Sequence, residues 1–166
     1  GTYEYINNLE EFTINAGLII NRRPVAGLIN APAKKRMFYA YAKGSSFELT
    51  NGKLTKLDCS KKTSNNSIKA VSYSNKIKPE IEKIHKKIGV TEYVKMKSSL
   101  KFCAIASGEY DVYVAEPRAF EWDIAAGHAI LENAGGLVSD FDGNNILYGK
   151  KNFKNPSLIL KSKNIL

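Results

Sequence analysis

The chain has 166 residues, 43% of them hydrophobic and 25% charged, which is an ordinary globular composition and excludes a fibrous or wholly disordered protein. The formal net charge of +9 suits an anionic ligand, but the lysines are scattered without interleaved aromatic residues, so no nucleic-acid partner is expected. No apolar run is long enough for a transmembrane segment, and Cys59 and Cys103 lack a metal-like spacing, which favours packed thiols in a reduced, cytoplasmic setting.

The first third of the chain has the pattern of an antiparallel meander that ends near Leu57. Four short apolar-rich segments are separated by turn-forming residues, and Asn51-Gly52 is a dipeptide typical of a tight hairpin turn. The four segments span residues 12–20, 25–30, 37–42 and 46–49. We expect residues 1–57 to form one domain.

A polar stretch at residues 59–66 is the best candidate for a linker, and beyond it strands and helices alternate. Helices are expected from Pro79 to Ile88, from Ser98 to Ala106, and from Asp123 to the glycine pair Gly135-Gly136. Short strands are expected at residues 68–72, 93–96, 111–115, 137–141 and 157–161. The alternation favours a layered α/β (α+β) fold in which residues 58–166 form a second domain.

The segment from Glu121 to Gly136 is the most informative part of the chain. Asp123 stands at the expected start of a helix of small residues, where its carboxylate either caps the first turn or holds a cation. Gly127 and the neighbouring alanines would let another element pack unusually close to that turn. His128 lies inside the same helix and is expected to be packed rather than to act as a base. The alternative without chemistry is a capped, well-packed helix.

The string Trp-Asp-Ile-Ala-Ala-Gly at residues 122–127, followed by Ala-Gly-Gly at 134–136, resembles the second signature of the inositol-monophosphatase-like superfamily of magnesium-dependent phosphatases. In that signature, the aspartate that matches Asp123 binds metal. Gly1-Thr2 and residues 11–19 resemble the end of the superfamily's first signature and the sequence that follows it. The resemblance runs from one end of the chain to the other. It implies a sugar-phosphatase fold of alternating helix and sheet layers, incomplete at the N-terminus. On this resemblance residues 1–57 would be the C-terminal part of the metal-binding domain, and residues 58–166 would be the substrate-side domain.

The resemblance also implies a reaction, the Mg²⁺-dependent hydrolysis of phosphate monoesters. Gly1 and Thr2 would bind phosphate through backbone amides, Thr2 would orient the attacking water, and Asp123 would be a metal ligand. The two aspartates that precede Gly1-Thr2 in the family's first signature are absent from the chain, as is an upstream glutamate. One aspartate cannot hold Mg²⁺ usefully by itself. We therefore expect the isolated chain to be inactive, with a missing N-terminal segment as a complementing partner.

A second string, Ser-Ser-Leu-Lys-Phe-Cys at residues 98–103, is similar to that of CysQ-type 3′(2′),5′-bisphosphate nucleotidases within the same superfamily. Those enzymes cleave 3′-phosphoadenosine 5′-phosphate to AMP and phosphate. The likeness implies that Ser98 and Lys101 bind the substrate. Ala115 stands where that branch usually carries an arginine, and Arg118 is the candidate to replace it as a phosphate-binding residue.

Two alternatives stay open at this point. Glu116 lies near the position where inositol phosphatases place a glutamate against substrate hydroxyls, so an inositol-phosphate or sugar-phosphate phosphatase is one alternative. A non-catalytic remnant, or one half of a split enzyme, is the other, because the aspartates expected before Gly1 are absent from this chain.

Overall fold

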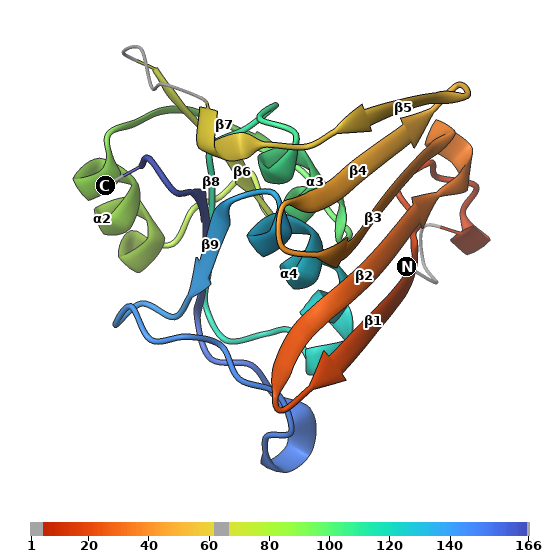
Figure 1. The fold of residues 1–166 in the computed structure, drawn as a ribbon. Helices are drawn as coiled ribbons and strands as arrows, with labels where there is room; N and C mark the ends of the chain where they lie inside the picture. Colours follow the sequence, from red (N-terminus) through yellow and green to blue (C-terminus); the bar gives the residue numbers. More distant parts are fainter. Residues whose placement is uncertain (1–4, 62–66, 166) are drawn as a thin grey trace.

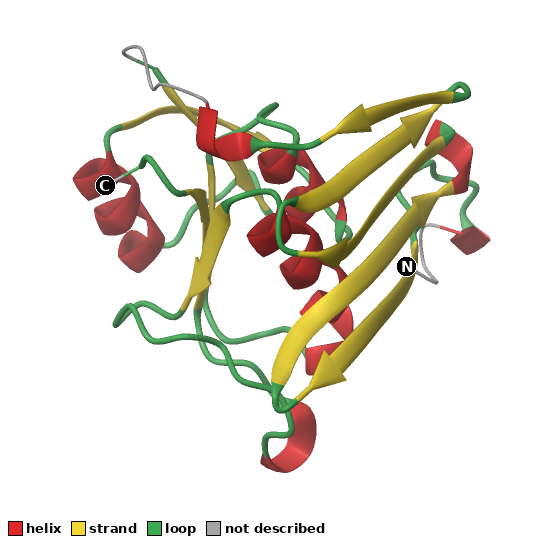
Figure 2. Ribbon diagram, viewed as in Figure 1, coloured by secondary structure: helices red, strands yellow, loops and turns green. Residues whose placement is uncertain are grey.

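The computed structural model describes residues 5–61 and 67–165 of the chain. Two five-stranded sheets lie on either side of helices α3 (Leu100–Ala106) and α4 (Glu121–Asn133), and helix α2 (Pro79–Ile88) covers the far side of the second sheet (Figures 1 and 2). The arrangement confirms the predicted layering of helices and sheets. Gly1 and Thr2 lie outside the described residues.

The first sheet is the predicted antiparallel meander, with its strands in sequence order. Its strands are β1 (Ile14–Ile20), β2 (Arg23–Ala31), β3 (Arg36–Ala42), β4 (Ser45–Thr50) and β5 (Lys53–Lys56). The hairpin predicted at Asn51-Gly52 is confirmed, since both residues have positive φ, at 48° and 76°. Strand β1 begins two residues later than predicted, which leaves Thr13 in a segment that precedes the sheet.

The second sheet is mixed, in the order β7-β6-β8-β10-β9. Strand β6 pairs in parallel with both β7 and β8, whereas β10 runs antiparallel to β8 and β9. The strands are β6 (Ile68–Ser72), β7 (Val90–Lys95), β8 (Val112–Ala115), β9 (Gly136–Ser139) and β10 (Leu158–Ser162). The prediction of helix α2 is confirmed at both ends, since Pro79 begins it and Gly89 ends it with a φ of 84°.

Two predicted helix starts are wrong. Helix α4 begins at Glu121, so Asp123 is its third residue rather than its cap, and Phe120, with extended backbone, is the N-cap. Helix α3 begins at Leu100 with Ser99 as its N-cap, so Ser98 lies before the helix. Both starts were predicted from residues whose side chains commonly cap helices. Phe120, the actual N-cap of α4, has no side-chain hydrogen-bond acceptor, so its residue type does not indicate a cap.

The predicted linker is wrong at its first residues. Cys59 begins a short 3₁₀ helix, η2 (Cys59–Lys61), is buried, and donates its backbone N–H to the carbonyl oxygen of Ala134 over 3.0 Å. Cys59 and Cys103 are both buried free thiols, as expected.

The main hydrophobic core contains residues of both sheets and of α3 and α4. The division into two domains at residue 57 stays a prediction. Within the described ranges no helix is both long and apolar enough to cross a membrane.

Candidate active site

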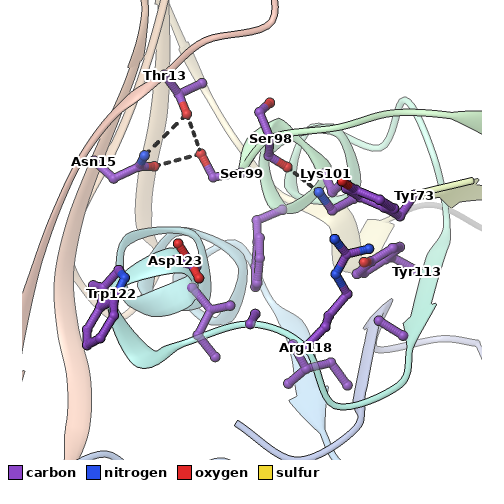
Figure 3. A pocket seen from close by; sticks show the side chains of 15 residues that line it. Thr13, Asn15, Tyr73, Ser98, Ser99, Lys101, Tyr113, Arg118, Trp122 and Asp123 are labelled. Atoms are coloured by element: carbon purple, nitrogen blue, oxygen red, sulfur yellow. Dashed lines mark hydrogen bonds between the residues drawn. The ribbon is translucent and has the colours of Figure 1, made fainter. Parts of the chain in front are cut away.

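A cavity of about 510 Å³ opens between β1, the start of α3, the start of α4 and the loop that follows β8 (Figure 3). Ser98, Lys101, Arg118 and Asp123, four of the residues predicted from the sequence, all line this cavity. They come from segments that are far apart along the chain. The fold therefore places two cationic side chains and one carboxylate in a single hollow.

Lys101 forms one wall of the cavity and is only 8% exposed. Burial, followed by the nearby positive charge of Arg118, lowers the pKa of Lys101 to about 8, while Glu11 and Asp123 oppose the shift. Its Nζ donates to the carbonyl oxygen of Ser98 and lies 5.2 Å from the centre of the Tyr113 ring. The ammonium group is thus held inside the cavity, poorly hydrated, where an anion would be bound strongly.

Arg118 comes from the loop that follows β8, and its guanidinium lies near Lys101 (Figure 3). Its guanidinium carbon lies over the Tyr73 ring, 3.3 Å from the ring centre, which is a cation–π contact. A second cavity, of about 340 Å³, shares Tyr73, Tyr113, Ala115 and Arg118 with the first. Ala115 carries only a methyl group and cannot bind phosphate through a charge. Arg118, three residues further along the chain, lines both cavities and supplies the cationic side chain.

Asp123 lies in the first turn of α4, as the third residue of the helix. Its Oδ2 accepts a hydrogen bond of 2.9 Å from the backbone N–H of Phe120, while the Asp123 N–H donates to the Phe120 carbonyl over 3.1 Å. The carboxylate lies on the cavity side of the helix, facing the start of β1 (Figure 3). The helix dipole favours a negative charge there.

Asp123 offers the oxygen ligand that Mg²⁺ prefers. In the described parts of the chain, no three His, Cys, Asp or Glu side chains gather closely enough to hold a metal ion. These residues therefore fit one ligand of a magnesium site and do not complete one.

A hydrogen-bonded group that the sequence did not reveal closes the top of the cavity. Thr13 Oγ1 and Ser99 Oγ are 2.9 Å apart, Ser99 Oγ donates to Asn15 Oδ1 over 2.6 Å, and Asn15 Nδ2 donates to Thr13 Oγ1 over 3.2 Å (Figure 3). The resemblance covered the segment around Thr13 and Asn15 but gave neither residue a role. Their contact with Ser99, more than 80 positions away, has no local sequence signal.

Two other polar residues have structural partners. His128 is buried, as expected, with Nδ1 2.9 Å from the Tyr148 hydroxyl and Nε2 3.1 Å from a Glu132 carboxylate oxygen, the latter without hydrogen-bond geometry. Glu116 pairs with Lys78 and lines the second cavity rather than the first. Neither residue lies among the groups that line the main cavity.

Comparison with known proteins places these features in a family. The model of the inositol monophosphatase family matches residues 1–165. The 3′(2′),5′-bisphosphate nucleotidase CysQ of Salmonella typhimurium is 33% identical over 157 residues, which cover 94% of this chain and 62% of that protein. The corresponding CysQ of Escherichia coli K12 is 31% identical, again with 62% of its length covered. The chain thus spans about three fifths of the length of these curated relatives.

Solved structures give the same result. The crystal structure of CysQ from Bacteroides thetaiotaomicron superposes with a TM-score of 0.83 at 30% identity, over 98% of this chain and 67% of that one. Inositol monophosphatase II from Staphylococcus aureus, at 21% identity and a TM-score of 0.78 over 99% of this chain and 60% of that one, shares the fold. The sequence match and the fold agree. The chain belongs to the inositol monophosphatase family.

Proposed function

We propose that this chain forms the substrate-binding side, and one part of the metal-binding side, of a Mg²⁺-dependent phosphomonoesterase. The observation that carries the proposal is that Asp123 shares one cavity with Lys101 and Arg118. Two cations attract a phosphate group, whereas a carboxylate repels it unless a divalent cation lies between them. A phosphatase that uses magnesium accounts for all three side chains.

In this proposal Asp123 is one magnesium ligand, and a bound Mg²⁺ would supply positive charge to the phosphoryl oxygens and lower the pKa of water. Lys101 and Arg118 bind and orient the phosphorylated substrate, and Ser98 contributes its hydroxyl at the cavity wall. Gly1 and Thr2, which the resemblance assigns to phosphate binding and to water orientation, lie outside the described residues and stay predictions.

We further propose that the substrate is a bisphosphate nucleotide such as 3′-phosphoadenosine 5′-phosphate. Water would cleave the 3′ phosphate ester to give AMP and inorganic phosphate. The two adjoining cavities support this choice, because Arg118 lines both of them and Lys76 lines the second. A molecule with two separated phosphate groups matches two adjoining hollows with cationic walls. The names of the CysQ relatives agree with the same choice.

An inositol-phosphate or sugar-phosphate substrate is the second candidate. Glu116 lines the second cavity, where its carboxylate could accept hydrogen bonds from sugar hydroxyls. However, Glu116 already pairs with Lys78. We therefore favour the nucleotide.

For the 166-residue chain alone we propose inactivity, with a complementing polypeptide as the source of the other metal ligands. Two observations on the described residues support this proposal. Asp123 is the one carboxylate among the described residues that line the main cavity, and no group of three or more possible metal ligands was found among them. The outward side chains of β1 give further support, since Ile14, Leu18 and Ile20 are each at least half exposed on a strand that, among the described strands, pairs with β2 alone. A segment that carries carboxylates and an apolar face would complete the site and cover this surface. A non-catalytic remnant is the contrary outcome.

Phosphate release tests the substrate choice. A version of the protein that also carries the two aspartates of the family's first signature is supplied with Mg²⁺ and either 3′-phosphoadenosine 5′-phosphate or an inositol monophosphate. We expect faster release from the nucleotide. Equal rates, or a preference for the inositol ester, would remove the nucleotide proposal while leaving the phosphatase proposal in place.

A further inference from the structure

The three hydrogen bonds among Thr13, Asn15 and Ser99 form a closed ring. The donor and the acceptor of each bond follow from the number of protons that each side chain can donate. The single hydroxyl proton of Ser99 is donated to Asn15 Oδ1. The bond between Thr13 and Ser99 must therefore use the Thr13 proton. Thr13 in turn accepts from Asn15 Nδ2. Each member donates once and accepts once around the ring, an arrangement in which neighbouring hydrogen bonds strengthen one another.

The ring joins the beginning of the first sheet to the beginning of α3. Thr13 immediately precedes β1 and Asn15 is the second residue of that strand, whereas Ser99 is the N-cap of α3 and is 8% exposed. The Ser99 side chain makes no capping bond to its own helix. Its hydroxyl is committed to the ring instead, so the start of α3 is held by a different layer of the fold.

Ser98, which precedes Ser99 in the chain, has an unusual backbone conformation. Ser98 has a φ of 59°, in the left-handed region that non-glycine residues rarely occupy. In this conformation the Ser98 carbonyl accepts from Lys101 Nζ. Such a conformation persists where surrounding contacts hold it, and the bonds of Ser99 to Thr13 and Asn15 are contacts of that kind.

We propose that the Thr13–Asn15–Ser99 ring positions Lys101, by fixing the turn whose carbonyl holds the Lys101 ammonium in the cavity. The three ring residues are positioning residues, since they act through Lys101. If the chain is part of a phosphatase, the first sheet, which lies beside the proposed metal ligand Asp123, also fixes the position of the phosphate-binding Lys101 ammonium. This consequence rests on the proposed function, whereas the effect on Lys101 does not.

The direct readout is the titration of Lys101, followed by the chemical shift of its side-chain carbon next to the ammonium in the 166-residue chain. The wild-type midpoint is expected near the pKa of about 8 set by burial and Arg118. The charged groups around it are Arg118, Glu11 and Asp123, and they are unchanged in ring variants. Opening the ring would hydrate the ammonium and raise the midpoint by about one pH unit.

Four variants separate positioning from stability. T13V removes one hydroxyl with little change of shape, and N15A alters an exposed residue, so N15A decides the result if T13V does not fold. T13S keeps the hydroxyl and should restore the wild-type midpoint. S107A removes a serine hydroxyl at the other end of α3, which bonds Ala104 and Glu109, and should leave the midpoint unchanged.

Binding of inorganic phosphate gives the second readout. We expect T13V and N15A to bind it about tenfold more weakly than wild type and S107A. Unchanged Lys101 midpoints in folded T13V and N15A would overturn the positioning role, whatever the phosphate affinity. A raised midpoint in a chain that binds no phosphate would support the positioning role and count against the proposed function, so the two failures are distinguishable.

Discussion

Gly27 of β2 lies against the backbone of Ala126 in α4, so closely that a Cβ at position 27 would come within 2.9 Å of the Ala126 α-carbon and nearer still to its oxygen. On another side of the helix, a Cβ at Gly127 would lie 2.6 Å from the Phe102 Cβ. The first turns of α4 are therefore fixed between the first sheet and α3. This packing places Asp123 beside β1 and the start of α3.

Replacing Gly27 by alanine should loosen this contact. Because the new methyl group meets helix backbone, which cannot rotate away, we expect G27A to lower the free energy of unfolding by about 2–4 kcal/mol. Urea denaturation measures the change. G44A is the control, since nothing lies within 4 Å of its Cβ and only its positive φ is strained, at a cost of about 1 kcal/mol. Equal stability of G27A and wild type would show that α4 does not dock as described.

Lys101 should make stability depend on pH. Its pKa is about 8 in the folded chain against 10.5 when exposed, so the unfolded chain holds the proton more tightly between these values. Stability from this group therefore rises with pH across that window and is lowest below about pH 8. K101M should be more stable than wild type at neutral pH, by up to about 3 kcal/mol, and the advantage should shrink as pH rises toward 10.5.

The difference between K101M and wild type isolates Lys101 from other titrating groups. Burial raises the pKa of Cys59 to about 11, which gives a slope of opposite sign at high pH, but that slope is common to both proteins. A pH-independent difference between the two unfolding curves would contradict the burial of the Lys101 ammonium.

Arg118 should matter more for a bisphosphate than for a monophosphate. Because its guanidinium borders both cavities, we expect R118A to weaken binding of 3′-phosphoadenosine 5′-phosphate at least about tenfold, with a smaller effect on an inositol monophosphate. Calorimetric titration of both ligands measures the effect. R23A, at an exposed arginine at the start of β2, is the matched control. An equal loss for both ligands would assign Arg118 to one shared phosphate.

Tyr148 supports α4 from inside the protein. Its hydroxyl is the partner of the buried His128 Nδ1, and Y148F would leave that nitrogen without a hydrogen bond. We expect a loss of about 1–3 kcal/mol in the free energy of unfolding, measured by thermal or urea denaturation. Y41F, at a tyrosine that is 64% exposed, should cost almost nothing. A neutral Y148F would mean that His128 finds another partner.

Much of the fold could be predicted because its signals are local. Pro79 and Gly89 bound helix α2 through their own backbone preferences, and Asn51-Gly52 forms the hairpin that this dipeptide favours. The start of α4 was missed because Phe120 caps through its backbone, while Asp123 bonds back from the third helical position.

The candidate site was only partly predictable. Ser98, Lys101, Arg118 and Asp123 were named from resemblance, and the structure gathers them around one cavity. The cation–π contact of Arg118 with Tyr73 and the hydrogen-bonded ring through Ser99 were not predicted. Both depend on which distant segments the two sheets bring together, and no periodicity or motif within either segment carries that information.

Mg²⁺-dependent phosphate release from 3′-phosphoadenosine 5′-phosphate, by a version of the protein that includes the first-signature aspartates, is the measurement that bears most directly on Asp123 as a magnesium ligand. It compares wild type with D123N, which keeps the acceptor for the Phe120 N–H, and with D142N, in an exposed turn far along the chain. We predict release that requires Mg²⁺, is lost in D123N and is retained in D142N. Release by D123N at the wild-type rate, or release that is independent of Mg²⁺, would contradict it.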